Sequence, residues 1–189
     1  MNGISCHRVT VWYLEECLFH LSRRKRHVGA LVLANKSMST ALINAATATI
    51  SDRDASIAFT EKANAALKSQ DVMKEYQILD RSRHNFLRTE VKGGREVLIL
   101  ALTHGAFGGD FSEEDEVVLN ELKLVRDLIE HPRPLEHAFD DEFLLRGIRK
   151  GVEIIRRFDF SPEVSRSAQI VSAVDDVELA CNAISNGGA

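Results

Sequence analysis

Cysteine and proline are both scarce in this chain of 189 residues, which contains three of each. The cysteines are odd in number and form no Cys-x-x-Cys pair, so the sequence indicates neither a disulfide framework nor a zinc knuckle. Long hydrophobic runs are also absent: the stretch from Val97 to Leu102 is far shorter than the ~20 apolar residues of a membrane-spanning helix. These absences exclude a disulfide-stapled secreted module, argue against membrane insertion and favour a reducing, cytoplasmic setting.

Patterns typical of β-structure are missing as well. No segment alternates apolar and polar residues cleanly, and no Asn-Gly or Asp-Gly turn joins two such segments. Hydrophobic residues make up 44% of the chain, which is enough for a core and excludes wholesale disorder. They recur at three- and four-residue steps, so the sequence predicts an all-α protein, an irregular bundle of about seven helices. The expected helices cover about 9–27, 30–50, 53–91, 95–104, 112–131, 134–158 and 161–184.

The predicted helices fall into two groups. Residues 1–94 supply N-terminal helices, including a long helical hairpin over about 30–92 that would protrude from the body or pack along it. The sequence leaves open whether 53–91 is one helix or two. Residues 95–185 are expected to form a compact helical core unit, with the apolar helix over 95–104 at its centre. We expect all of these helices to form one cooperative domain.

Arg126 and His131 are separated by four residues, and a polar residue, Asp127, directly follows the arginine. This spacing resembles the signature of the HEPN ribonucleases, which are all-helical domains that dimerise. The resemblance implies a metal-independent endoribonuclease in which His131 polarises the 2′-hydroxyl or the leaving group and Arg126 holds the scissile phosphate. The alternative is a helix end that carries two cations near its negative pole.

A second resemblance covers the stretch 97–125. An apolar helix is followed by a Gly-rich acidic turn at 105–110 and by a helix start that Ser112 and Asp115 would cap. This order resembles the repeat unit of tellurite-resistance TerB-type helical domains. It implies a divalent cation held through oxygen atoms near Asp110, Glu113 and Glu114. The alternative is that glycine makes the turn and the acids favour the helix N-terminus.

The basic residues gather in one run, Arg23-Arg24-Lys25-Arg26, followed by His27. Residues 1–50 carry six basic and two acidic side chains, although the whole chain has a net charge of −4. The net charge therefore argues against a uniformly basic nucleic-acid-binding surface, but not against a local contact from the run to phosphates or to another anionic partner. The alternative is a solvated helix end.

Motifs of conventional enzymes are lacking. There is no Gly-x-Ser-x-Gly elbow and no Gly-rich phosphate loop. Our leading hypothesis is therefore a non-enzymatic, cytoplasmic helical interaction protein that needs no cofactor: an adaptor, chaperone or regulator that binds a protein partner. A ribonuclease using Arg126 and His131 and a TerB-like cation-binding domain are the alternatives, and homodimerisation is left open.

Overall fold

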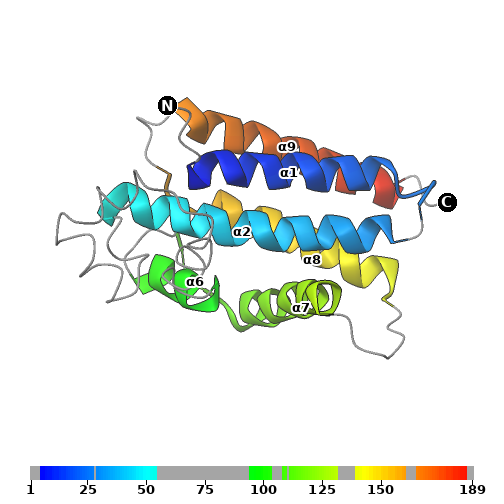
Figure 1. The fold of residues 1–189 in the computed structure, drawn as a ribbon, viewed down its shortest axis with the longest axis horizontal. Coiled ribbons are helices and arrows are strands. Elements are labelled where there is room, and N and C mark those ends of the chain that lie inside the picture. The colour runs from blue at the N-terminus through cyan, green and yellow to red at the C-terminus, as the bar shows by residue number, and fades with distance from the viewer. Residues whose placement is uncertain are drawn as a thin grey trace, which may run out of the picture.

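The computed structural model describes residues 5–27, 29–54, 94–103, 108–109, 111–131, 139–160 and 165–186, and every regular element in these ranges is an α-helix (Figure 1). The predicted all-α class is therefore confirmed. The described part of the chain holds six helices rather than seven: α1 (Cys6–Ser22), α2 (Ala30–Asp54), α6 (Gly94–Thr103), α7 (Glu113–Glu130), α8 (Asp141–Arg156) and α9 (Ser165–Asn186). None of these helices is both long and apolar enough to cross a bilayer.

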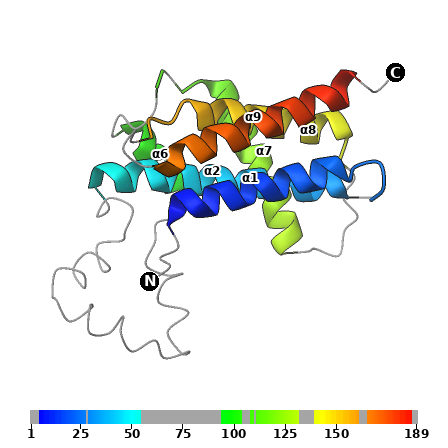
Figure 2. The ribbon, with the colours of Figure 1, turned by 90° about the horizontal axis from the view of Figure 1, so that it is seen from above.

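The helices are arranged in three layers of two (Figure 1). α1 and α9 form one outer layer, α2 and α8 the middle layer, and α6 and α7 the other outer layer. α1 and α2 make one antiparallel hairpin, α8 and α9 make another, and the two hairpins pack side by side (Figures 1 and 2). α2 contacts α1, α8, α7 and α6, so it is the central helix of the described fold. The division of the helices into the groups 1–94 and 95–185, within one domain that unfolds cooperatively, stays a prediction.

Small side chains suit α2 to this central position. Its alanines, among them Ala34, Ala41 and Ala45, are completely buried and allow neighbouring helices to approach closely. α8 contributes two glycines to the same contact. A Cβ atom on Gly147 would lie 2.7 Å from Nδ2 of Asn35, and one on Gly151 would lie 2.5 Å from Cγ of Met38. The α2–α8 contact is therefore too close for any larger residue at these positions without movement of the facing side chain.

The end of α2 differs from the sequence-based expectation. We expected one helix to end near residue 50 and a new one to begin near residue 53, but α2 continues through Ser51 and Asp52 to Asp54. The reason is that Asp52 has a tertiary partner: Oδ2 of its carboxylate accepts a hydrogen bond from Nε2 of the buried His7 at 3.0 Å. The rest of the expected helix, and with it most of the hairpin over 30–92, lies outside the described residues.

Three further boundaries are corrected. α1 begins at Cys6, where the Ser5 side chain caps the helix, and it ends at Ser22 instead of near residue 27. The basic run Arg23–Arg26 therefore forms a turn, and Gly29, with φ of 84°, helps to reverse the chain. α8 begins at Asp141 with Asp140 as its N-cap, seven residues after the expected start at Pro134, which lies outside the described residues.

The apolar helix α6 is not at the centre of the core. It lies in an outer layer and packs against α2 through Val97 and Ala101, which are completely buried. The side chain of Ile99, by contrast, is 48% exposed. The prediction of a central helix was wrong: among the described helices α6 packs mainly on α2, and it buries one of its faces there.

A buried ionic cluster joins the start of α7 to the end of α8. The predicted capping box is confirmed: the Asp115 N–H donates to Oγ of Ser112 at 3.1 Å, and the Ser112 N–H donates to Oδ2 of Asp115 at 2.9 Å. Asp115 is only 1% exposed, and its carboxylate also binds Nη1 of Arg157 at 2.9 Å and Nζ of Lys150 at 3.2 Å. Burial opposes ionisation, but these hydrogen bonds prevail and lower the pKa of Asp115 to about 2.

Candidate functional site

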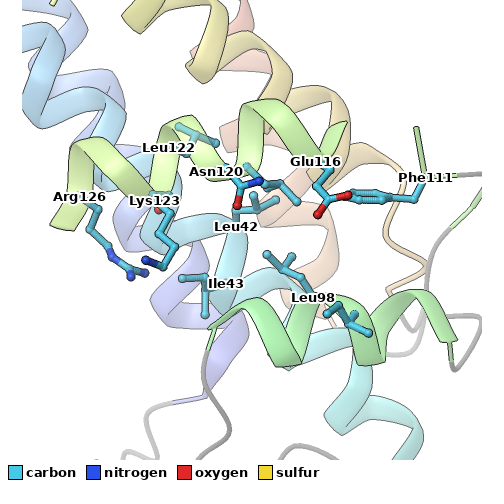
Figure 3. Close-up of a pocket in the computed structure, with 12 residues that line it drawn as sticks. Leu42, Ile43, Leu98, Phe111, Glu116, Asn120, Leu122, Lys123 and Arg126 are labelled. Atoms are coloured by element: carbon cyan, nitrogen blue, oxygen red, sulfur yellow. The ribbon is translucent and has the colours of Figure 1, made fainter. Parts of the chain in front are cut away.

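An apolar groove lies between α2, α6 and α7, with a cavity volume of about 290 Å³ (Figure 3). α2 forms its floor, and α6 and α7 form its walls. The groove exists because α6 packs on α2 beside α7 and leaves part of its own apolar surface uncovered. Its apolar lining comes from all three helices: Leu42 and Ile43 of α2, Leu98 and Ile99 of α6, and Leu119 and Leu122 of α7.

Polar side chains follow the α7 wall at successive helical turns. Glu116, Asn120, Lys123 and Arg126 are spaced by four, three and three residues, which places them on one face of the helix. At 1.5 Å per residue, the stretch from Glu116 to Arg126 spans about 15 Å. Glu116 lies near Phe111 at one end of the groove, whereas Lys123 and Arg126 extend together at the other end (Figure 3). The groove is thus acidic at one end and basic at the other.

The two basic side chains share one carboxylate. Asp127 accepts hydrogen bonds from Nη2 of Arg126 at 2.8 Å and from Nζ of Lys123 at 2.5 Å. Partial burial would raise the pKa of Asp127, but the hydrogen bonds from these two cations lower it below its usual value. Arg126 also approaches Glu130, with Nε 3.8 Å from Oε2. The cations are therefore held in place beside the groove by acids of their own helix.

The two residues of the predicted ribonuclease pair, Arg126 and His131, lie in different surroundings. Arg126 is half-buried at the groove, whereas His131 caps the C-terminus of α7, with its backbone N–H donating to the Asp127 carbonyl at 2.9 Å and its side chain exposed. Among the contacts of the described residues, none joins the two side chains. The ribonuclease site stays a prediction. It predicts that the protein cleaves RNA in the presence of a chelator and that His131→Ala abolishes this cleavage.

The acidic helix start provides no assembled metal site in the described part of the chain. Glu113 and Glu114 are exposed, and Asp110 lies outside the described residues. Asp115 binds Ser112 and two cations, as described above. Within the described ranges no three His, Cys, Asp or Glu side chains are grouped so that they could hold a metal ion. The TerB-like cation site near Asp110 therefore stays a prediction.

The basic turn Arg23–Arg26 lies at one end of the bundle. Arg23 packs over the ring of Phe19, with Cζ 3.9 Å from the ring centroid. No acidic side chain in the described ranges forms an ion pair with the four basic residues, and all but the half-buried Arg24 are exposed. An anionic partner at this turn also stays a prediction.

Comparison with known proteins adds no further constraint: no family model, curated protein or solved structure matches the chain.

The groove was not predicted from the sequence, although two signals for it were present. One was that α6 is apolar on nearly all sides. The other was the row of polar residues on α7 that borders the buried positions Val118, Leu122 and Val125.

Proposed function

We propose that this protein is a non-enzymatic helical interaction protein, an adaptor, chaperone or regulator, that binds a segment of a protein partner in the groove between α2, α6 and α7. The observation that supports this proposal is the uncovered apolar face of α6. Ile99 is 48% exposed and lies beside Leu98 at a concave, apolar surface. A continuous apolar surface of this kind on a folded protein is typical of a binding site.

The form of the groove favours a helical segment as its occupant. A cavity of about 290 Å³ is at the small end of the range for ligand sites, so it suits a few apolar side chains rather than a large cofactor. An amphipathic helix presents such side chains at i, i+3 or i+4, and i+7 along one face. An amphipathic helical segment of a protein partner therefore fits both the apolar floor and the polar rim of the groove.

Replacing Ile99 with lysine tests the proposal. Because a lysine would place a charge against the apolar side chains of the partner, we expect the affinity to fall by at least about tenfold. Ile99 is half-exposed, so the free energy of unfolding should change by less than about 1 kcal/mol. A partner would first be isolated from the native host and purified, and its binding to the wild type and the variant would then be measured by calorimetry.

Leu179→Lys is the matched control. Leu179 is 67% exposed and lies on α9, in the outer layer opposite the groove, so the same chemical change there should leave the affinity unchanged. Equal affinities of the wild type and Ile99→Lys would rule out the groove as the binding site. Loss of binding only in Leu179→Lys would place the partner on the opposite face.

A further inference from the structure

The outward face of α1 carries two large aromatic side chains. Leu14, Cys17 and Leu21 are buried and mark the inner face of this helix. At about 100° per residue, Trp12 and Phe19 lie on the opposite side, and they are 48% and 47% exposed. Trp12 is also the only tryptophan of the chain. Large aromatic side chains exposed on one helix face are typical of an interaction surface.

Each of these two rings has an arginine over it. Cζ of Arg8 is 5.8 Å from the centroid of the Trp12 ring, and Cζ of Arg23 is 3.9 Å from that of Phe19. The four residues are spaced by four, seven and four positions, so they form one stripe along the outward face of α1. Tryptophan and arginine are among the residues that most often dominate the binding energy of protein–protein interfaces. The composition of the stripe therefore favours a protein as its partner.

A hollow of about 360 Å³ lies beside this stripe, between α1 and α9. Two acids line it, Glu15 of α1 and Asp176 of α9. Both are exposed, and neither forms an ion pair in the part of the chain that the structure describes. Arg8 lines the hollow as well, with its guanidinium over Trp12. The two acids can therefore accept hydrogen bonds from a cation that enters the hollow from outside.

The basic turn after α1 carries cations that match these acids. Arg23 and Arg26 are exposed, and neither forms an ion pair within the described ranges. Glu15 lies four residues before Phe19, and Arg23 lies four residues after it. Trp12 and Arg26 lie seven residues before and after Phe19. The outward face of α1 is therefore self-complementary about Phe19: the residues on one side of it match those on the other side in a second copy of the chain.

From this arrangement we propose that the protein forms a two-fold symmetric homodimer in which two α1 helices pack antiparallel and cross at Phe19. Residues at equal distances before and after the crossing point lie side by side in such a pair. Glu15 therefore binds Arg23 of the second copy, about 6 Å from the axis at about 1.5 Å per residue. Arg26 of the second copy reaches the hollow beside Trp12, about 10 Å from the axis. The two-fold symmetry forms each of these contacts twice.

A second copy accounts for this face better than an anionic surface does. A membrane of acidic lipids or a nucleic acid would attract the arginines, but it would repel Glu15 and Asp176, which lie beside them. In a parallel pair of α1 helices, each charge would face the same charge of the second copy. The antiparallel pair brings the acids and the cations together.

The dimer leaves the groove between α2, α6 and α7 open. α1 and α9 form one outer layer of the bundle, and α6 and α7 form the opposite one (Figure 1). The two grooves of a dimer therefore face away from the contact between the copies. One dimer then binds two partner segments, a consequence that rests on the proposed function. The dimer itself does not depend on that function.

Sedimentation equilibrium of the full chain tests the dimer. The contact involves one helix and the edge of a second from each copy, which is at the low end of interface size, so we expect a Kd on the order of 10 μM. The wild type should therefore change from monomer to dimer between about 1 and 100 μM.

Charge reversal tests the register of the two helices. In Glu15→Arg and in Arg23→Glu, both symmetric pairs become repulsive, so each variant should raise the Kd by at least about tenfold. Because both residues are exposed, the urea midpoint of unfolding should stay that of the wild type. Glu153→Arg is the matched control. It reverses an exposed acid of α8 that pairs with Lys150, outside the layer of α1 and α9, and it should dimerise like the wild type.

A mixture of the two variants gives the decisive measurement. In a heterodimer of Glu15→Arg with Arg23→Glu, the introduced arginine faces the introduced glutamate. The native Arg23 of the first copy faces the native Glu15 of the second. Every pair is again of opposite charge, so the mixture should dimerise about as well as the wild type, although neither variant does so alone. The double variant Glu15→Arg/Arg23→Glu should recover for the same reason.

The outcomes of these measurements are distinct. A wild type that stays monomeric up to about 500 μM overturns the dimer. If that monomer binds vesicles of phosphatidylserine and Arg23→Glu does not, the face belongs to a membrane instead. A mixture that stays monomeric overturns the antiparallel register about Phe19. None of these measurements uses a ligand of the groove, so the dimer and the proposed function succeed or fail independently.

Discussion

Replacing Asp115 with alanine should lower the free energy of unfolding by about 3 kcal/mol, the largest loss that we expect from a polar substitution in this protein. The change removes the capping box with Ser112, which is worth about 1 kcal/mol. It also removes the charge-assisted hydrogen bond from Arg157, which is worth about 1.5–3 kcal/mol before solvent competition reduces it, and the ion pair with Lys150. Urea unfolding at pH 7 measures the difference.

Glu114→Ala is the control for this prediction. Glu114 is in the same first turn and lies 3.7 Å from Nζ of Lys150, but it is exposed and does not take part in the capping box. Its removal should cost less than about 1 kcal/mol, as for other exposed ion pairs. Similar losses in the two variants would show that the buried position of Asp115 contributes nothing beyond the charge of the helix start.

The same cluster predicts a pH dependence of stability. The pKa of Asp115 is about 2 in the folded protein and 3.8 ordinarily, so the folded state prefers the ionised form. Its contribution to stability is therefore complete above about pH 4 and is lost as the pH falls towards 2, with a total of about 2 kcal/mol. The difference in unfolding free energy between the wild type and Asp115→Asn should shrink over this range. A difference that stays constant from pH 6 to pH 2.5 would contradict the assignment.

The capping box shows what the sequence could and could not predict about this region. Ser112 and Asp115 are three residues apart, and their interaction depends only on local helix geometry, so the pattern identified it correctly. Arg157 lies 42 residues further along the chain and reaches Asp115 only because α8 packs against α7. No spacing rule connects the two residues, so the ionic cluster became visible only in the fold.

The groove has a similar origin. The sequence makes α6 apolar nearly all round, and from this we expected it to lie in the centre of the core. Burial also depends on how a helix packs in the fold, and among the described helices α6 packs mainly on α2 and leaves Ile99 48% exposed. The apolar surface of α6 that lines the groove was thus visible in the sequence, but only the arrangement of the helices showed that part of this surface is uncovered. The all-α class needed no such information, because each helix follows from its own 3.6-residue pattern.

Close packing between α2 and α8 leads to the second large prediction. Alanine normally stabilises a helix interior by about 1 kcal/mol relative to glycine. In Gly151→Ala, however, the new methyl group would lie 2.5 Å from Cγ and 2.7 Å from Sδ of Met38, which is completely buried. Overpacking of this kind costs about 1–3 kcal/mol, so it outweighs the gain in helix propensity, and the net result should be a loss of about 1 kcal/mol in urea unfolding.

A double-mutant cycle with Met38→Ala tests the cause of that loss. Met38→Ala alone should cost about 2–5 kcal/mol, because it leaves a cavity in the α2–α8 contact. In the double variant the methyl group of residue 151 enters that cavity, so the combined loss should be about 2 kcal/mol smaller than the sum of the two single losses. Gly147→Ala is the matched control, since its methyl group meets Asn35 and not Met38, and Met38→Ala should not rescue it. Additive losses for Gly151→Ala and Met38→Ala would mean that the helices move apart to admit the methyl group, and that the glycine does not set their separation.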